Sequence, residues 1–210
     1  MVDFQSRDRK RTEDETAEES DASTGGESET ADEDGEGSHD HDHDHGHGHV
    51  PDSVGVAVVT VSSSRSLDDD PSGDAIQSIL EDAGHEIVTR EVLRDDYDGV
   101  QSAVDALAGR GDVDAIVTTG GTGVTPDDVT VEAVEPLFDK SLPGFGELFR
   151  RKSVEEIGTR VVATRATAGV VDGVLTVCLP GSENAARLGA DEILTAELPH
   201  LVGLATRGNE

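Results

Sequence analysis

The chain has 210 residues and a formal net charge of −30, because 46 acidic side chains face only 16 lysines and arginines. An electric field of this sign repels nucleic acids and anionic membrane surfaces, so we expect neither as a partner. The length suits one folded domain with a tail. Cys178 is the only cysteine, which excludes an intrachain disulfide and is consistent with a reducing compartment.

The acidity extends over the whole chain. Residues 1–50 hold 17 of the 46 acidic side chains, and the chain contains only three lysines. A folded surface this acidic repels itself in dilute buffer and stays soluble where concentrated salt screens its charges, so we predict a halophilic protein. No apolar stretch approaches the roughly 18–20 residues that span a bilayer, and the first residues contain no apolar signal-peptide core. These features predict a soluble, cytoplasmic protein.

Residues 1–50 are predicted to be a disordered, acidic, histidine-rich tail, because they lack the apolar side chains that would offset the entropy of ordering. Six histidines recur there at every second position: His39, His41, His43, His45, His47 and His49. Imidazoles at this density bind Zn²⁺, Ni²⁺ or Cu²⁺. A solvated tail with only incidental metal affinity is the simpler interpretation, because no surrounding framework fixes the ligands.

Residues 51–210 are predicted to form one α/β domain. Apolar, valine-rich runs alternate with helical patterns that repeat every three to four residues. The expected strands and helices are, in order, residues 54–61, 72–83, 86–93, 98–108 and 113–119. This alternation is typical of a doubly wound, mostly parallel sheet with helices on both faces.

The second half of the domain adds a helix, a small β-hairpin and a final helix. We expect the first helix to follow the Pro-Gly-Phe-Gly-Glu segment at residues 143–147 and to run to about Ile157. Two valine-rich runs, 161–170 and 174–179, flank Asp-Gly at residues 172–173, which is typical of a tight hairpin turn. The final helix follows Ser182, and its expected inner face consists of Ala185, Gly189, Ile193 and Ala196.

Ligands of parallel sheets bind beyond the carboxyl ends of the strands, which directs attention to the loops after residues 61, 93 and 119. Glycines in such a loop let a ligand approach the backbone closely and present N–H groups to an anion. A tight turn at the strand end would also explain them without a ligand. The glycine-rich segment after the third predicted strand consists of Thr119, Gly120, Gly121, Thr122 and Gly123.

Carboxylates follow two neighbouring predicted strands. Asp128 comes soon after the glycine-rich segment and Asp95 ends the second strand, so the two could share one Mg²⁺ ion. Alternatively, Asp95 and Asp96 open a helix, where acidic residues favour the helix dipole. For Asp127 we favour a capping or solvated position, and we expect Thr130 to be the N-cap of the next helix.

Four motifs follow one another along the domain: TTGGTG at residues 118–123, PDDVT at 126–130, LPGFGELFR at 142–150 and LPGS at 179–182. In this order and at these distances they resemble the MoaB/MogA family. The resemblance extends from about Val54 to His200.

The resemblance implies a doubly wound α/β domain, a homotrimer and a molybdopterin adenylyltransferase. Active members of the family transfer AMP from ATP to the terminal phosphate of molybdopterin with Mg²⁺ and release pyrophosphate. By resemblance, Asp128 and Asp95 are catalytic and bind the Mg²⁺. Molybdopterin and phosphate binding is assigned to Thr119, Gly120, Gly121, Thr122, Gly123, Pro180, Gly181 and Ser182. Supporting positions of the motif are Pro143, Gly144, Phe145, Gly146, Glu147, Ser153 and Arg165.

Some alternatives stay open. Asp127 is acidic where the family motif has a basic residue, which would alter phosphate affinity at low salt. A non-catalytic molybdopterin-binding protein of the same pathway is the alternative function. A nucleotide hydrolase of the competence-damage-inducible family shares this domain, although the PGFGE wording argues against it. The downstream metal-inserting enzyme is an expected partner, and the sequence does not distinguish molybdenum from tungsten.

Overall fold

The computed structural model describes residues 50–206, so the predictions for the tail and its six histidines lie outside the described residues. Within that range the strands are β1 (Gly55–Val61), β2 (Glu86–Leu93), β3 (Ala115–Thr119), β4 (Lys140–Ser141), β5 (Thr167–Val171) and β6 (Val174–Leu179). The helices are α1 (Pro71–Asp82), α2 (Tyr97–Ala108), α3 (Thr130–Val134), α4 (Pro143–Ile157), α5 (Glu183–Gly189) and α6 (Thr195–Ala205).

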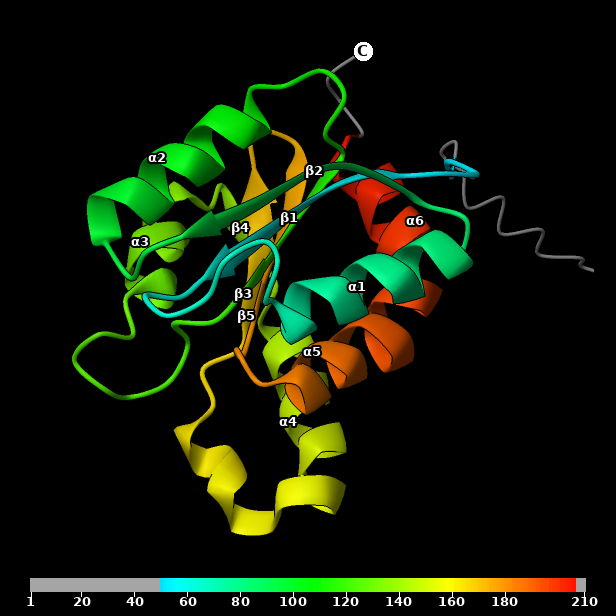
Figure 1. Ribbon diagram of the computed structural model, residues 1–210. Coiled ribbons are helices and arrows are strands. Elements are labelled where there is room, and N and C mark those ends of the chain that lie inside the picture. Colours follow the sequence, from blue (N-terminus) through cyan, green and yellow to red (C-terminus); the bar gives the residue numbers. More distant parts are fainter. Residues whose placement is uncertain (1–49, 207–210) are drawn as a thin grey trace, which may run out of the picture. The chain divides into compact units, whose positions relative to one another are not determined.

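The six strands form one sheet in the order β2-β1-β3-β6-β5-β4. The neighbours β2, β1, β3 and β6 are parallel, whereas β5 pairs antiparallel with both of its neighbours, β6 and β4. The predicted fold class, a doubly wound and mostly parallel sheet with a small hairpin, is therefore confirmed (Figure 1). The chain moves from β1 outward to β2 and then back to β3 on the other side of β1. That change of direction opens a crevice at the carboxyl ends of the strands.

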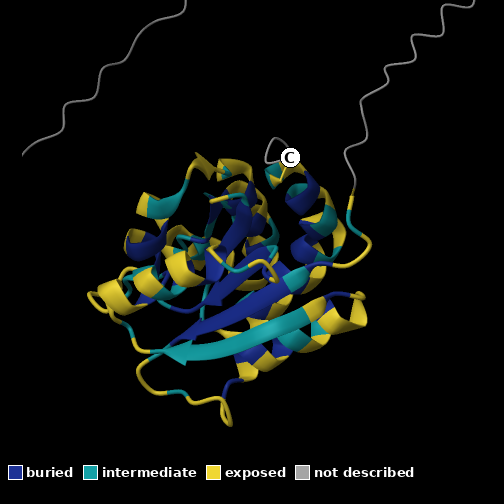
Figure 2. Ribbon diagram, turned by 90° about the horizontal axis from the view of Figure 1, so that it is seen from above, coloured by how far each residue is buried: buried dark blue, intermediate teal, exposed yellow. Residues whose placement is uncertain are grey.

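Two apolar layers hold the helices against the sheet. Side chains alternate along β1, so Val56 and Val58 pack beneath α1, α4, α5 and α6, while Ala57 and Val59 pack beneath α2 and α3. Figure 1 shows these helix groups on opposite faces of the sheet. The central strands are buried and the edge strand β2 is only partly covered (Figure 2). This burial explains why the central strands consist almost entirely of apolar residues.

The first strand of the predicted hairpin was placed too early. Residues 158–163 form a 3-10 helix, and β5 begins only at Thr167. The valine-rich pattern is misleading because this segment does not join the sheet, and Val162 is 86% exposed. The hairpin turn itself is confirmed, since Asp172 and Gly173 both have positive φ, at 48° and 84°.

The final helix is not continuous. A π-helical turn at Ala190–Leu194 separates α5 from α6. The wider turn shifts the phase of the helix, so Leu194 and Leu198 are buried, whereas Ala196, predicted on the inner face, is exposed. A strict period of 3.6 residues cannot foresee such an insertion.

Two buried side chains have shifted pKa values. Cys178 is fully buried, and this burial raises the pKa of its thiol to about 12, so the thiol is protonated and packs as an apolar group. His85 is 7% exposed, and neither ring nitrogen has a hydrogen-bond partner among the described residues. Burial lowers the pKa of His85 below its ordinary value of 6.5.

We expect His85 to make the fold sensitive to mild acid. Its neutral form stabilises the folded state fully above the unfolded pKa, and this contribution is lost as the pH falls from 6.5 toward the lowered folded pKa. Thermal unfolding measured across this range should show the wild type losing stability more steeply than His85→Leu. His200→Gln changes an exposed histidine and should follow the wild type. Parallel curves for wild type and His85→Leu would refute the assignment.

None of the helices within residues 50–206 is long and apolar enough to cross a membrane.

Candidate functional site

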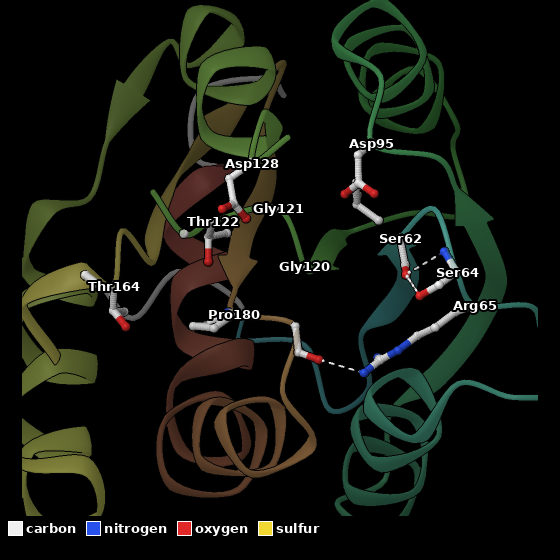
Figure 3. A pocket seen from close by; sticks show the side chains of 14 residues that line it. Ser62, Ser64, Arg65, Asp95, Gly120, Gly121, Thr122, Asp128, Thr164 and Pro180 are labelled. Atoms are coloured by element: carbon white, nitrogen blue, oxygen red, sulfur yellow. Dashed lines mark hydrogen bonds between the residues drawn. The ribbon is translucent and has the colours of Figure 1, made fainter. Parts of the chain in front are cut away.

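A cavity of about 390 Å³ lies where β1, β2, β3 and β6 end. Its position at the carboxyl edge of the parallel strands is the one expected from the strand order. Figure 3 shows the cavity with the glycine turn between the two carboxylates. The residues that line it are Val61, Ser62, Ser64, Arg65, Asp95, Gly120, Gly121, Thr122, Gly123, Asp128, Ala163, Thr164, Pro180 and Gly181.

The glycine turn after β3 is possible only with glycine. Gly120 has φ +103°, and a Cβ atom there would lie 2.2 Å from the carbonyl oxygen of Val61. Gly121 has φ +65°, and its Cβ would lie 2.2 Å from the hydroxyl of Thr130. These contacts fold the backbone against the ends of β1 and α3, which leaves main-chain atoms instead of side chains on the cavity wall. A wall of this kind can present N–H groups to an anion.

Thr130 has a different role from the predicted N-cap. It is the first residue of α3, and its hydroxyl donates to the carbonyl oxygen of Gly120 at 2.8 Å. Its N–H donates to the carbonyl oxygen of Gly121 at 3.0 Å. Thr130 therefore secures the glycine turn to the start of α3.

The Pro180-Gly181 turn after β6 forms the opposite part of the wall. The Thr119 hydroxyl donates to the carbonyl oxygen of Pro180 at 3.0 Å, and a Cβ at Gly181 would lie 3.0 Å from the Cα of Gly120. The two turns pack backbone against backbone, so Thr119 orients the neighbouring turn and is not itself among the lining residues.

Asp128 reaches the cavity from the loop that follows the glycine turn. Its Oδ2 accepts hydrogen bonds from the N–H of Thr125 at 2.8 Å and the hydroxyl of Thr125 at 2.6 Å. Burial would raise the pKa of Asp128, but the hydrogen bonds from Thr125 and Gly123 and the charge of Arg165 lower it below 3.8. The carboxylate is therefore ionised at neutral pH. Both hydrogen bonds from Thr125 reach the same oxygen, Oδ2.

Asp95 reaches the cavity from the end of β2. Its Oδ2 accepts a hydrogen bond from the Ser63 hydroxyl at 2.7 Å, which links the loops after β1 and β2. The alternative role at the start of α2 belongs to Asp96, whose carboxylate accepts from the N–H of Gly99 at 2.8 Å. The structure thus separates the two neighbouring acids, one facing the cavity and the other capping a helix.

The carboxylates suit a metal that is bound partly by substrate. No cluster of three or more His, Cys, Asp or Glu side chains able to hold a metal occurs within residues 50–206. Mg²⁺ is usually held by one or two carboxylates, with phosphates and water completing its coordination. Asp95 and Asp128 line one cavity, and the Oδ1 of each accepts no hydrogen bond from another side chain of the described residues, so the pair fits this type of site.

Arg165 fastens the loop that carries Asp128. Its Nε donates to the carbonyl oxygen of Gly123 at 2.7 Å, its Nη2 donates to that of Asp128 at 3.3 Å, and both Nη atoms contact the carboxylate of Glu132. Its own N–H donates to the carbonyl oxygen of Thr122 at 3.2 Å. One residue therefore holds three parts of the loop, two through its side chain and one through its main chain.

We expect Arg165→Gln to loosen this loop and to lower the free energy of unfolding by about 1–2 kcal/mol, because charged hydrogen bonds to backbone carbonyls are lost. Amide hydrogen exchange at residues 120–129 should become faster. Arg151→Gln removes the same charge from an exposed position on α4 and should change neither quantity. Unchanged exchange in a stably folded Arg165→Gln would show that the loop does not depend on this clamp.

The other predicted residues lie outside the cavity. Ser182 is the exposed N-cap of α5 and accepts from the N–H of Ala185 at 3.3 Å. Phe145 and Phe149 stack in the core with ring centroids 6.4 Å apart, and the Ser153 hydroxyl donates to the carbonyl oxygen of Phe149. These positions, together with Pro143, Gly144, Gly146 and Glu147, belong to α4 and do not line the cavity.

Several lining residues were missed. Ser62, Ser64 and Arg65 come from the loop after β1, and Ala163 and Thr164 come from the segment before β5. The loop after β1 was predicted to bind a ligand, but its serine-rich sequence favours no particular residue. An arginine in the loop that follows a buried strand, in so acidic a chain, was the signal that could have been used.

Comparison with known proteins agrees with the architecture of this site. Residues 57–200 match the family described as "Probable molybdopterin binding domain". Molybdenum cofactor biosynthesis protein B of Bacillus subtilis is 44% identical over 146 residues, covering 68% of this chain and 85% of that protein.

Two solved structures are also similar. The molybdopterin biosynthesis enzyme MoaB from Thermus thermophilus has a TM-score of 0.65 and 31% identity, covering 73% of this chain and 96% of that one. The tungsten cofactor synthesizing protein MoaB from Pyrococcus furiosus has a TM-score of 0.63 and 38% identity, covering 74% and 98%. The chain therefore belongs to the MoaB/MogA family of molybdopterin-binding domains.

Proposed function

We propose that the protein acts in molybdenum cofactor biosynthesis as a molybdopterin adenylyltransferase. The observation that carries this proposal is the combination, in one cavity, of a glycine turn suited to phosphate and two carboxylates suited to Mg²⁺. Family membership supports the pterin as the ligand. The names of the relatives support the pathway.

In this reaction an oxygen of the terminal phosphate of molybdopterin attacks the α-phosphorus of ATP. The bond between that phosphorus and the oxygen leading to the β-phosphate breaks, and pyrophosphate leaves. Such a transfer needs alignment and charge stabilisation more than covalent help. No cysteine is among the described residues that line the cavity, and the thiol of Cys178 is buried and protonated. We therefore expect direct transfer without a covalent intermediate on the protein.

Each part of the cavity then has a task. The main chain of residues 120–123 and of the Pro180-Gly181 turn holds a phosphate by close approach. Asp95 and Asp128 would hold Mg²⁺, which when bound offsets the negative charge that develops on the departing pyrophosphate. Arg165 keeps Asp128 in place through the backbone of its loop.

We also expect a homotrimer, as the family resemblance implies. Exposed apolar side chains at the end of α4 and just beyond it, Val154, Ile157 and Val162, offer a surface that a second copy would cover. Light scattering on the full chain in molar KCl decides this point. A monomer at micromolar concentration would contradict it.

The proposed activity is tested by pyrophosphate release from ATP and Mg²⁺ with and without molybdopterin. Release that requires both molybdopterin and Mg²⁺ supports an adenylyltransferase. Tight molybdopterin binding without release identifies the protein as a non-catalytic binding protein of the same pathway. This non-catalytic binding protein is the main alternative, because Asp127 is acidic where the family motif has a basic residue.

A further inference from the structure

The cavity has one cationic wall. Arg65 is the only lysine or arginine among the described residues that line it, opposite the carboxylates Asp95 and Asp128. Figure 3 shows its guanidinium beside the Pro180-Gly181 turn, away from the two acids. In a chain with a net charge of −30, a local cation is needed wherever an anionic group is to bind.

Arg65 is held in place mainly by neutral groups. Its Nη1 donates to the Ser72 hydroxyl oxygen at 2.8 Å, and its Nη2 donates to the carbonyl oxygen of Gly181 at 3.0 Å. The Ser72 hydroxyl donates to the same carbonyl at 2.8 Å. These contacts fix the direction of the side chain without neutralising its charge.

Asp70, the carboxylate that forms an ion pair with Arg65 among the described residues, is shared. Asp70 is buried and accepts from the Thr60 hydroxyl at 2.5 Å, from the N–H of Gly73 at 3.1 Å and from Arg90 at 3.0 Å. Burial would raise the pKa of Asp70, but these hydrogen bonds lower it, so Asp70 carries one negative charge at neutral pH. Its contact with Arg65 is the longest, at 3.3 Å. Arg90 also pairs with the exposed Asp74 at 2.7 Å, so two carboxylates balance the two arginines overall. Arg65 is the positively charged member of this group that faces the cavity.

Arg65 also retains free hydrogen-bond donors. Of its five N–H groups, the Nε proton and one Nη2 proton have no partner among the described residues. Its side chain is 26% exposed, so these donors are accessible from the cavity. A fixed guanidinium with two free donors matches the geometry of a phosphate oxygen pair.

We propose that Arg65 binds a phosphate group of the substrate and so orients it between the cationic wall and the carboxylates. The inference deepens the proposed function and rests on it for the identity of the molecule that carries the phosphate. Two sources have this chemistry, the terminal phosphate of molybdopterin and the phosphates of ATP. In either case the phosphate would bind beside the Pro180-Gly181 turn, where Arg65 is held.

The test measures binding by calorimetry on the full chain in molar KCl, with molybdopterin, dephosphorylated molybdopterin, ATP and inorganic pyrophosphate as separate probes. For Arg65→Gln we expect at least roughly tenfold weaker binding of the phosphate-bearing probe that Arg65 holds. If that probe is molybdopterin, its dephosphorylated form should bind the wild type and Arg65→Gln equally. Weakened ATP binding alone would assign Arg65 to the nucleotide.

Two further variants separate charge from structure. Arg65→Lys keeps the charge but not the planar pair of donors, so it should restore only part of the affinity. Arg110→Gln removes an exposed charge before β3, at the opposite end of the sheet, and should bind like the wild type. Thermal unfolding of each variant shows whether a loss of affinity comes from a damaged fold. If Arg65→Gln does not fold, the affinity of folded Arg65→Lys decides whether Arg65 binds the phosphate.

Binding of every probe within twofold of the wild type in folded Arg65→Gln would overturn the inference. A wild type that binds none of the probes would overturn it as well. A wild type that binds the phosphate-bearing probes through Arg65 but transfers no AMP would refute the proposed activity alone.

Discussion

Asp128→Asn is expected to lower the rate of AMP transfer by roughly 100-fold or more while leaving molybdopterin binding nearly unchanged. The amide is isosteric and its oxygen can still accept the two hydrogen bonds from Thr125, so the loop should keep its shape. What is lost is the negative charge that would hold Mg²⁺. The measurement is single-turnover AMP transfer at several Mg²⁺ concentrations, together with molybdopterin affinity.

The neighbouring acid supplies the control. Asp127→Asn removes the same charge from an exposed position that does not line the cavity, and in molar KCl, where such a charge is screened, it should retain the wild-type rate. The pKa of Asp128 lies below 3.8, so Asp128 stays ionised and its titration should not reduce the wild-type rate from about pH 9 down to pH 5. Equal rates for wild type and Asp128→Asn would remove Asp128 from the catalytic site.

Gly120→Ala is expected to destabilise the fold by about 2 kcal/mol or more and to abolish phosphate binding. Its φ of +103° is strained for any other residue, and the added methyl group would lie 2.2 Å from the backbone oxygen of Val61. A backbone atom cannot rotate away as a side chain can, so the turn or the end of β1 must shift. Thermal unfolding and pyrophosphate binding check the two effects separately.

Gly111→Ala is the matched control. A Cβ at Gly111 would meet nothing within 4 Å, and its φ is not in the left-handed region. This variant should be as stable as the wild type or slightly more stable, because alanine restricts the unfolded chain. A stable Gly120→Ala that still binds pyrophosphate would contradict the described geometry of the turn.

Periodicity predicted the parallel strands of the sheet. The bounds of β2 and β6 agree with the predicted ranges, and β1 and β3 differ by one or two residues. Helix α4 begins earlier than predicted, at Pro143, because the segment expected to precede it is its first turn. Burial on both faces selects long apolar runs, which are readable without a structure. The prediction of a strand at residues 161–166 was wrong, because a valine-rich run outside the sheet has the same composition as a strand.

The candidate site was predicted where its residues directly follow the predicted strands. Residues 120–123, Asp128 and Asp95 were found from the rule that ligands bind beyond the strand ends. Arg65 was missed because its role depends on Asp70, Ser72 and Gly181, which only the fold brings beside it. Ser182 caps α5 as expected, and its phosphate binding stays a prediction, since it is not among the residues that line the cavity.

The prediction of salt tolerance and the interpretation of the histidine-rich tail stay predictions, since the latter concerns residues outside the described range. The described residues that line the cavity all lie between residues 61 and 181, so we expect metal binding by the tail to be separable from the site. Removal of residues 1–49 should therefore leave molybdopterin binding unchanged.

The most direct test of the central claim is mass spectrometry of the pterin after incubation of the full chain with ATP, Mg²⁺ and molybdopterin in molar KCl. The proposal predicts adenylyl-molybdopterin and one pyrophosphate for each pterin converted, with neither formed when Mg²⁺ is removed. Unmodified molybdopterin recovered from a folded protein that binds it tightly would contradict the transferase and leave a binding protein.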